Sequence, residues 1–154
     1  MKVMAEYLET TADKFTFRVA TDRRYTVQGV WAKPEPGTNR VRLGLADYPQ
    51  QHNGDVAFAN VKPAGSRVAI GETFAEIETI KALVELAVPV SGRIIEVNAA
   101  LAAAPELINQ SPYENGWLAV VEVPAWETER SELQQPAGYF EVMNAQIQKE
   151  LKGL

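Results

Sequence analysis

Hydrophobic and polar residues alternate in short stretches along most of the chain, and residues typical of turns separate these stretches. The clearest stretch is Val84–Val90, in which the valines and the leucine at even positions share one face, while Glu85, Ala87 and Pro89 share the other. A period of two predicts a half-buried β-strand. Similar patterns predict further strands at Arg24–Trp31, Arg40–Leu45, Val56–Val61, Arg67–Ile70, Thr73–Ile80, Arg93–Asn98 and Trp117–Val123, and an edge strand in which Phe15, Phe17 and Val19 alternate.

Helical patterns are short until the end of the chain. Asp47–Asn53 predicts a short helix capped by Asp47 and ended by Gly54, and Pro105–Asn109 predicts one helical turn with proline in its first position. After Pro124 the residues favour helix, with apolar positions three or four apart from Phe140 to Leu151. Pro136-Ala137-Gly138 divides this tail, so the helix is expected to begin near Tyr139.

The order of these elements predicts the fold class. The strands follow one another without the crossover helices that a parallel sheet requires, so a barrel or a sandwich is favoured over a parallel α/β sheet. The chain of 154 residues is long enough for one domain with a sizeable core. We therefore predict a small, mainly β domain with a short internal helix and a C-terminal helix.

The amino-acid composition argues against several classes of function. The chain contains no cysteine and a single histidine, His52, which excludes disulfides, thiolate metal sites, a cysteine nucleophile and a histidine-rich metal cluster. With 15 Lys and Arg against 20 Asp and Glu, the net charge of −5 argues against non-specific nucleic-acid binding. No apolar run reaches the roughly 18 residues of a membrane span, and the first residues lack the pattern of a secretion signal. The predicted location is the cytoplasm.

Lys81 is the residue that the pattern singles out. It is the only basic residue between Arg67 and Arg93, a stretch that is otherwise rich in glutamate. It falls where one predicted strand ends and the next begins, which places it at or beside the tip of a hairpin. An exposed lysine there is accessible to the active site of another protein. The hairpin alone leaves two interpretations, a solvated lysine paired with Glu78 or Glu85, or an attachment point for another group.

Several sequence segments, which occur in a fixed order, resemble a known family and so decide between the two interpretations of Lys81. The segments are LGLADYPQQ at 43–51, GDVAF at 54–58, ETIKAL at 78–83, PVSGRIIEVNAAL at 89–101 and PELINQSPYENGW at 105–117, with a looser match at 24–31. Together they resemble the glycine-cleavage H-protein family, whose Glu-x-x-Lys motif falls on Glu78 and Lys81. The segments distinguish the chain from biotin carriers, which place methionine on both sides of the modified lysine where Ile80 and Ala82 stand here.

This resemblance implies a hybrid barrel-sandwich fold in a single domain, 1–154, with an N-terminal extension at 1–23, a core at 24–123 and a helical tail at 129–152. It implies that Lys81 carries lipoate in amide linkage and that a lipoate-attaching enzyme recognises Glu78. The chain is then a carrier rather than an enzyme, and its partner enzymes supply the catalysis. The family's usual state is a monomer.

Two positions differ from the glycine-cleavage pattern. The resemblance implies that proteins of the family hold the loaded lipoyl-lysine arm in a cleft that includes a histidine and an aspartate. Here Gly29 and Glu85 occupy those two positions. These changes resemble a second branch of the family, the lipoate-binding proteins of the heterodisulfide-reductase-like sulfur-oxidation system. The leading hypothesis is a lipoyl carrier that shuttles a sulfur-bound intermediate to such a complex.

The alternative is the glycine-cleavage carrier, with glycine decarboxylase, aminomethyltransferase and dihydrolipoamide dehydrogenase as partners. A third hypothesis is an unmodified interaction module that keeps the fold without the cofactor.

Overall fold

The structure is a computed structural model and describes residues 6–153. Its larger sheet has six antiparallel strands in the order β3-β4-β5-β11-β10-β7. The smaller sheet has three antiparallel strands in the order β6-β8-β9. The bounds in the larger sheet are β3 (Arg24–Tyr25), β4 (Val30–Pro34), β5 (Arg40–Leu45), β7 (Arg67–Val68), β10 (Gly92–Val97) and β11 (Ala119–Glu122), and those in the smaller sheet are β6 (Val56–Val61), β8 (Thr73–Thr79) and β9 (Leu83–Ala87).

The main core lies between these two sheets. Leu43 and Val121 of the larger sheet and Ile77 and Leu86 of the smaller one belong to a single buried cluster. Burial of such aliphatic side chains contributes about 1.5–3 kcal/mol each. More buried and less buried positions alternate over 40–43 in β5 and over 75–79 in β8, which is why the period of two in the sequence was informative.

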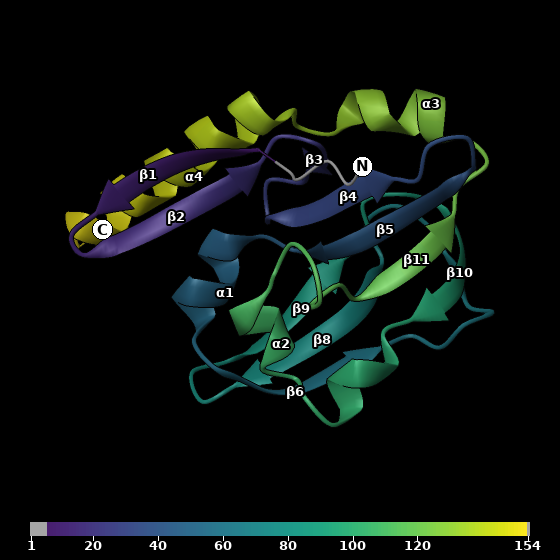
Figure 1. Ribbon diagram of the computed structural model, residues 1–154, viewed down its shortest axis with the longest axis horizontal. Helices are drawn as coiled ribbons and strands as arrows, with labels where there is room; N and C mark the ends of the chain where they lie inside the picture. Colours follow the sequence, from purple (N-terminus) through teal and green to yellow (C-terminus); the bar gives the residue numbers. More distant parts are fainter. Residues whose placement is uncertain (1–5, 154) are drawn as a thin grey trace.

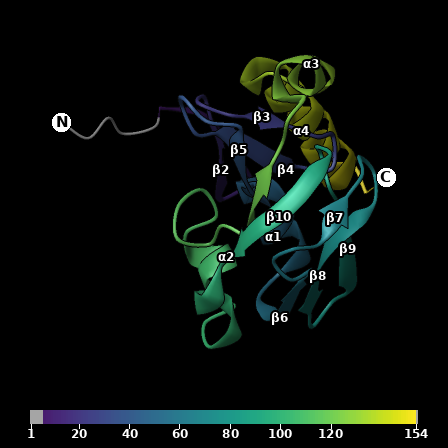
Figure 2. The ribbon, with the colours of Figure 1, turned by 90° about the vertical axis from the view of Figure 1, so that its right-hand side faces the viewer.

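A second, aromatic core lies under the C-terminal helix. The hairpin of β1 (Tyr7–Ala12) and β2 (Phe15–Ala20) runs alongside α4 (Pro136–Leu151) (Figure 1). The rings of Tyr25 and Tyr139 stack there with centroids 4.6 Å apart. In both views α4 and the smaller sheet lie on opposite sides of the molecule (Figures 1 and 2).

Short helices complete the fold. Within the described residues, no helix is long and apolar enough to cross a membrane. The helices are α1 (Asp47–Asn53), a 3₁₀ helix at Ala99–Ala102, α2 (Leu107–Gln110), α3 (Trp126–Glu129) and a 3₁₀ helix at Arg130–Glu132.

The mainly β class is confirmed, and three predicted ranges, those of β5, β6 and α1, match the structure residue for residue. Gly54 ends α1 with a positive φ of 88°, as predicted. The predicted capping role of Asp47 is wrong, because Ala46 occupies the cap position. The Asp47 carboxylate instead accepts a hydrogen bond of 2.9 Å from the backbone N–H of Arg18 and so ties α1 to β2.

Other predicted boundaries were also wrong: β9 is Leu83–Ala87 rather than Val84–Val90, and β11 is Ala119–Glu122 rather than Trp117–Val123. Three further differences have clear local reasons. Arg24–Trp31 is not one strand: the Gly29 N–H donates to the Thr26 carbonyl at 3.0 Å, and this turn separates β3 from β4. β7 ends at Val68, two residues before the predicted end, because the chain turns at Ala69. α4 begins at Pro136 rather than near Tyr139, since proline fits the first position of a helix, where no N–H donor is needed.

Candidate functional site: an exposed lysine at a hairpin tip

The β8–β9 hairpin presents Lys81 at its tip, as the sequence predicted. Thr79 ends β8 and is buried, and its hydroxyl oxygen accepts hydrogen bonds of 3.1 Å from the backbone N–H groups of Lys81 and Ala82. The Thr79 N–H donates to the Ala82 carbonyl at 2.9 Å and closes the turn. The buried threonine therefore fixes the backbone of the tip, while the side chains of Ile80 and Lys81 remain exposed.

The Lys81 side chain folds back over the end of α1. Its Nζ donates a hydrogen bond of 2.7 Å to the carbonyl oxygen of His52. The stem passes Gly54 at ordinary van der Waals separation, with 3.7 Å between the Lys81 Cδ and the position that a Cβ at residue 54 would occupy. The amine thus meets one of the carbonyl groups that a helix C-terminus leaves without an intrahelical partner.

Carboxylates occupy the outer face of the same sheet. Glu78 lies opposite Leu83, and Glu76 lies opposite Glu85, in the register of β8 and β9. Residues directly opposite one another in an antiparallel pair share a face. Glu78 and Glu85 are exposed, so Glu78 is available to another protein three residues before Lys81.

Gly29 has no room for a side chain. A Cβ at this position would lie 2.4 Å from the Pro49 Cγ and 2.8 Å from the Tyr139 hydroxyl oxygen. Its φ of +97° is also rarely adopted by residues with a side chain. The fold therefore excludes an imidazole at position 29: a proline of α1 and a tyrosine of α4 already occupy that space.

An imidazole lies near the end of α1, on the residue whose backbone carbonyl accepts the Lys81 hydrogen bond. His52 and Glu150 help to line a pocket of about 380 Å³ between the ends of α1 and α4. His52 Nδ1 contacts a Glu150 carboxylate oxygen, and the Tyr48 hydroxyl donates to that oxygen at 2.7 Å. Burial, together with the hydrogen bond to Glu150, raises the pKa of the Tyr48 phenol well above its ordinary value. The sequence placed His52 at the end of a surface helix but did not connect it with Lys81 or Glu150.

Gln28 is a structural contact that sequence reasoning missed. Its side-chain amide donates to the Glu85 carbonyl at 2.7 Å and accepts from the Ala87 N–H at 3.1 Å. Because β9 is an edge strand, these two bonds satisfy backbone groups that no neighbouring strand reaches. Gln28 thereby joins the turn that contains Gly29 to the strand that carries Glu85. Gln28 lay within the predicted strand Arg24–Trp31, and that assignment gave no signal of this contact.

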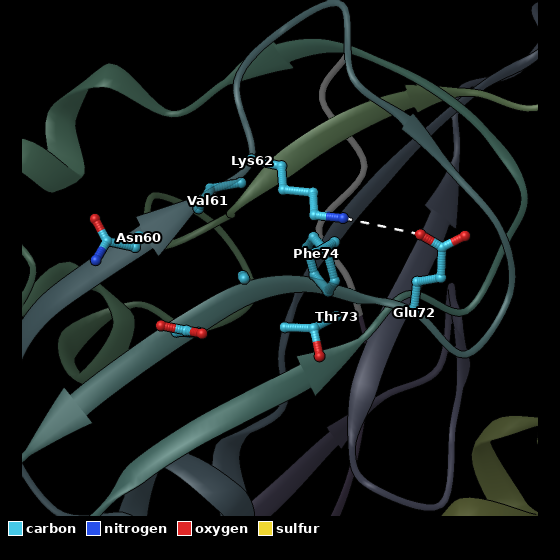
Figure 3. A pocket seen from close by; sticks show the side chains of 8 residues that line it. Asn60, Val61, Lys62, Glu72, Thr73 and Phe74 are labelled. Carbon is cyan, nitrogen blue, oxygen red and sulfur yellow. Dashed lines mark ion pairs between the residues drawn. The ribbon is translucent and has the colours of Figure 1, made fainter.

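A pocket of about 510 Å³ lies at the other end of β8 and does not involve Lys81 (Figure 3). Lys62 and Glu72 form an ion pair of 3.8 Å at its edge. Among residues 6–153, no three histidine, aspartate or glutamate side chains come together in a way that could hold a metal ion.

The lysine on this tight hairpin is exposed and therefore accessible to another protein. The tip leaves room for a long acyl group, because Lys81 and its neighbours Ile80 and Ala82 are all exposed. The fold and this tip thus define a small β protein with an exposed lysine at the end of a hairpin.

Comparison with known proteins identifies the family. The sequence model of the glycine cleavage H-protein matches residues 23–146, and the chain belongs to this family. A glycine cleavage system H protein from Oceanobacillus iheyensis is 36% identical over 118 residues, which cover 77% of this chain and 91% of that protein. A probable glycine cleavage system H protein from Thermococcus kodakarensis is 38% identical over 130 residues, 84% of this chain and 95% of that protein.

A solved structure supports the same assignment. The crystal structure of a glycine cleavage system H protein from Mycobacterium marinum superposes with a TM-score of 0.69 at 31% identity, covering 87% of this chain and 98% of that one. The predicted barrel-sandwich hybrid fold is therefore confirmed. Members of the family are non-catalytic carriers with lipoate covalently attached to a lysine, as the resemblance implied.

Proposed function

We propose that Lys81 bears lipoate in amide linkage and that the chain carries an aminomethyl group between the enzymes of glycine cleavage. The observation that carries the proposal is the exposed Lys81 at the hairpin tip, three residues after the exposed Glu78. The similar proteins named above, all described as glycine cleavage H proteins, favour this role over the sulfur-oxidation hypothesis.

The residues of the chain contribute position and access. Thr79 holds the tip backbone, and the exposed Glu78 offers a carboxylate to the lipoate-attaching enzyme. Acylation of Lys81 removes the ammonium charge that now faces the His52 carbonyl. When attached, the lipoyl group supplies a dithiolane that can be reduced to two thiols. A tether of this kind raises the local concentration of its end group at each partner.

The partners under this proposal are a lipoate-attaching enzyme, glycine decarboxylase, aminomethyltransferase and dihydrolipoamide dehydrogenase. The cytoplasmic location, the monomeric state and the single-domain organisation stay predictions of the sequence.

Carriage of a sulfur-bound intermediate is the second candidate, and one observation favours it. Position 29 cannot hold an imidazole, because Pro49 and Tyr139 fill the space that its side chain would need. If glycine cleavage requires a histidine at that position to hold the amine, the arm of this chain serves other chemistry. The similar proteins named above are all described as glycine cleavage H proteins, so glycine cleavage remains the first candidate.

Intact mass spectrometry tests the attachment. The chain is expressed with a lipoate-attaching enzyme and lipoate, and we expect a mass gain of one lipoyl group that the conservative variant Lys81→Arg lacks. Unchanged mass in the parent chain would refute both carrier functions and support the unmodified module. The lipoylated protein is then assayed in the exchange of bicarbonate into glycine by glycine decarboxylase. Robust exchange supports the first candidate, and its absence with a fully loaded protein supports the second.

A further inference from the structure

Apolar side chains flank Glu78 on the outer face of the smaller sheet. Phe58 of β6 and Leu83 of β9 both lie opposite Glu78, so the three side chains form one row across the sheet. Phe58 is 65% exposed, Leu83 is 62% exposed, and Ile80 at the tip is 97% exposed. Large apolar residues that gather on one exposed face are typical of an interaction site.

An irregularity in β6 turns Phe58 outward. Val56 pairs with Thr79 and Phe58 pairs with Glu78, so two steps along β6 correspond to one step along β8. In a regular ladder Phe58 would lie opposite Ile77, whose side chain is fully buried. The extra residue, Ala57, therefore moves a phenylalanine from the core face to the solvent face. Bulges that redirect a side chain in this way are common beside functional sites.

Negative charge surrounds the apolar row. Within residues 6–153, no lysine or arginine forms an ion pair with Glu76, Glu78 or Glu85. Lys81 is the cation nearest to them in the hairpin, and it points to the end of α1. A complementary protein surface would therefore be apolar at its centre and would carry lysine or arginine at its edge.

We infer that the Phe58–Glu78–Leu83 row is the docking surface for the enzyme that acylates Lys81. This inference rests on the proposed attachment of lipoate at Lys81. The unmodified lysine is a short side chain that starts from the hairpin tip and ends on the His52 carbonyl, so an enzyme that reaches its amine must approach the tip itself, next to the outer surface of β6, β8 and β9. Enzymes that act after lipoylation bind the end of the longer lipoyl-lysine arm, so they need not contact this row. Glu78 supplies the charge for recognition, and Phe58 and Leu83 supply the apolar contact.

The test is the rate of lipoylation by a purified lipoate–protein ligase with ATP and lipoate, followed by intact mass at varied concentrations of the carrier. We expect Phe58→Ala and Leu83→Ala each to raise KM about tenfold with little change in kcat, since exposed contacts of this kind contribute to binding rather than to the chemical step. Ile70→Ala, which removes an apolar side chain that is 54% exposed elsewhere on the surface, should keep the parent KM.

Competition gives a readout that does not depend on acylation. Lys81→Arg protein, which cannot accept lipoate, should inhibit loading of the parent chain, and adding Phe58→Ala to it should weaken that inhibition about tenfold. Thermal unfolding confirms that each variant is folded, and Leu83→Asn probes the row independently if one variant fails to fold.

The outcomes separate the two proposals. A parent chain that is loaded with the same KM as Phe58→Ala and Leu83→Ala would overturn the docking surface and leave lipoylation intact. Unchanged loading with a fall in glycine decarboxylase exchange would assign the row to a later partner and also overturn the inference. A parent chain that is never loaded would refute the proposed function and the docking surface together.

Discussion

Replacing Gly29 by alanine should destabilise the protein through two separate effects. The backbone has a φ of +97°, and the left-handed region costs about 1–2 kcal/mol for a residue with a side chain. The added Cβ would also lie 2.4 Å from the Pro49 Cγ. Overpacking at a tight site costs about 1–3 kcal/mol. The sum predicts that Gly29→Ala lowers the free energy of unfolding by about 2–5 kcal/mol.

The neighbours of Gly29 have little freedom to move. Pro49 is a rigid ring within α1, and the fully buried Tyr139 ring stacks on Tyr25. Gly37 provides a matched control, because its φ is +78° and, apart from its two chain neighbours, no described residue has a heavy atom within 4 Å of its Cβ position. Gly37→Ala should therefore show the conformational cost alone.

Urea unfolding of the two variants separates the effects. The free energy of unfolding should fall about 1–3 kcal/mol further in Gly29→Ala than in Gly37→Ala, the difference being the steric cost. Equal losses in the two variants would refute the conclusion that α1 and α4 fill this space. In that case an imidazole at position 29 would again be compatible with the fold.

Further predictions concern single side chains. Tyr139→Phe should raise the free energy of unfolding in urea by up to about 1 kcal/mol, since no hydrogen-bond partner for the buried hydroxyl lies within residues 6–153; a fall in the free energy of unfolding would instead show that the hydroxyl makes a bond. Burial raises the pKa of the Tyr139 phenol above its ordinary value, so its contribution is complete below about pH 10, where the unfolded phenol titrates, and is lost as the pH rises toward the folded pKa. The melting temperature should therefore fall above about pH 10, less steeply in Tyr139→Phe, and equal slopes would contradict this. Lys81→Ala should change stability by less than about 0.5 kcal/mol in urea unfolding, because the side chain is exposed; a larger loss would mean that the lysine supports the fold. Glu129→Ala should cost about 1–3 kcal/mol in the same assay, because its carboxylate accepts bonds from the Ser91 N–H and hydroxyl, whereas Glu127→Ala, whose side chain is 80% exposed, should cost little.

Much of the architecture followed from local pattern. Alternation over Arg40–Leu45 and Val56–Val61 gave two strands with their observed bounds, because one face of each is buried against the opposite sheet. The change of pattern between Thr73–Ile80 and Val84–Val90 placed Lys81 at a tip, since a strand cannot reverse direction without a turn. The errors at Arg24–Trp31 and at the start of α4 came from residues whose effect depends on their exact place in an element.

The surroundings of the site were less predictable. Nothing in the order of residues connects Gln28 with β9, or His52 with Glu150, because each pair meets only when separate elements pack together. The bulge at Ala57 shifts the pairing of β6 with β8 by one residue, and the sequence pattern of β6 alone does not reveal where this shift occurs. Phe58 would therefore be assigned to the core or to the surface depending on a pairing that the strand itself does not specify.

The sequence by itself determined the class of fold, the hairpin and the identity of the lysine at its tip, because strand alternation and turn residues are local properties of the chain. Only the tertiary structure decided that Pro49 and Tyr139 leave no room for a side chain at position 29, since that requires α1 and α4 to pack over the same turn. The same holds for the exposed row beside Lys81: the register of three strands brings Phe58 and Leu83 to either side of Glu78. Pairing between strands is a non-local property, so it appears only when the chain is folded.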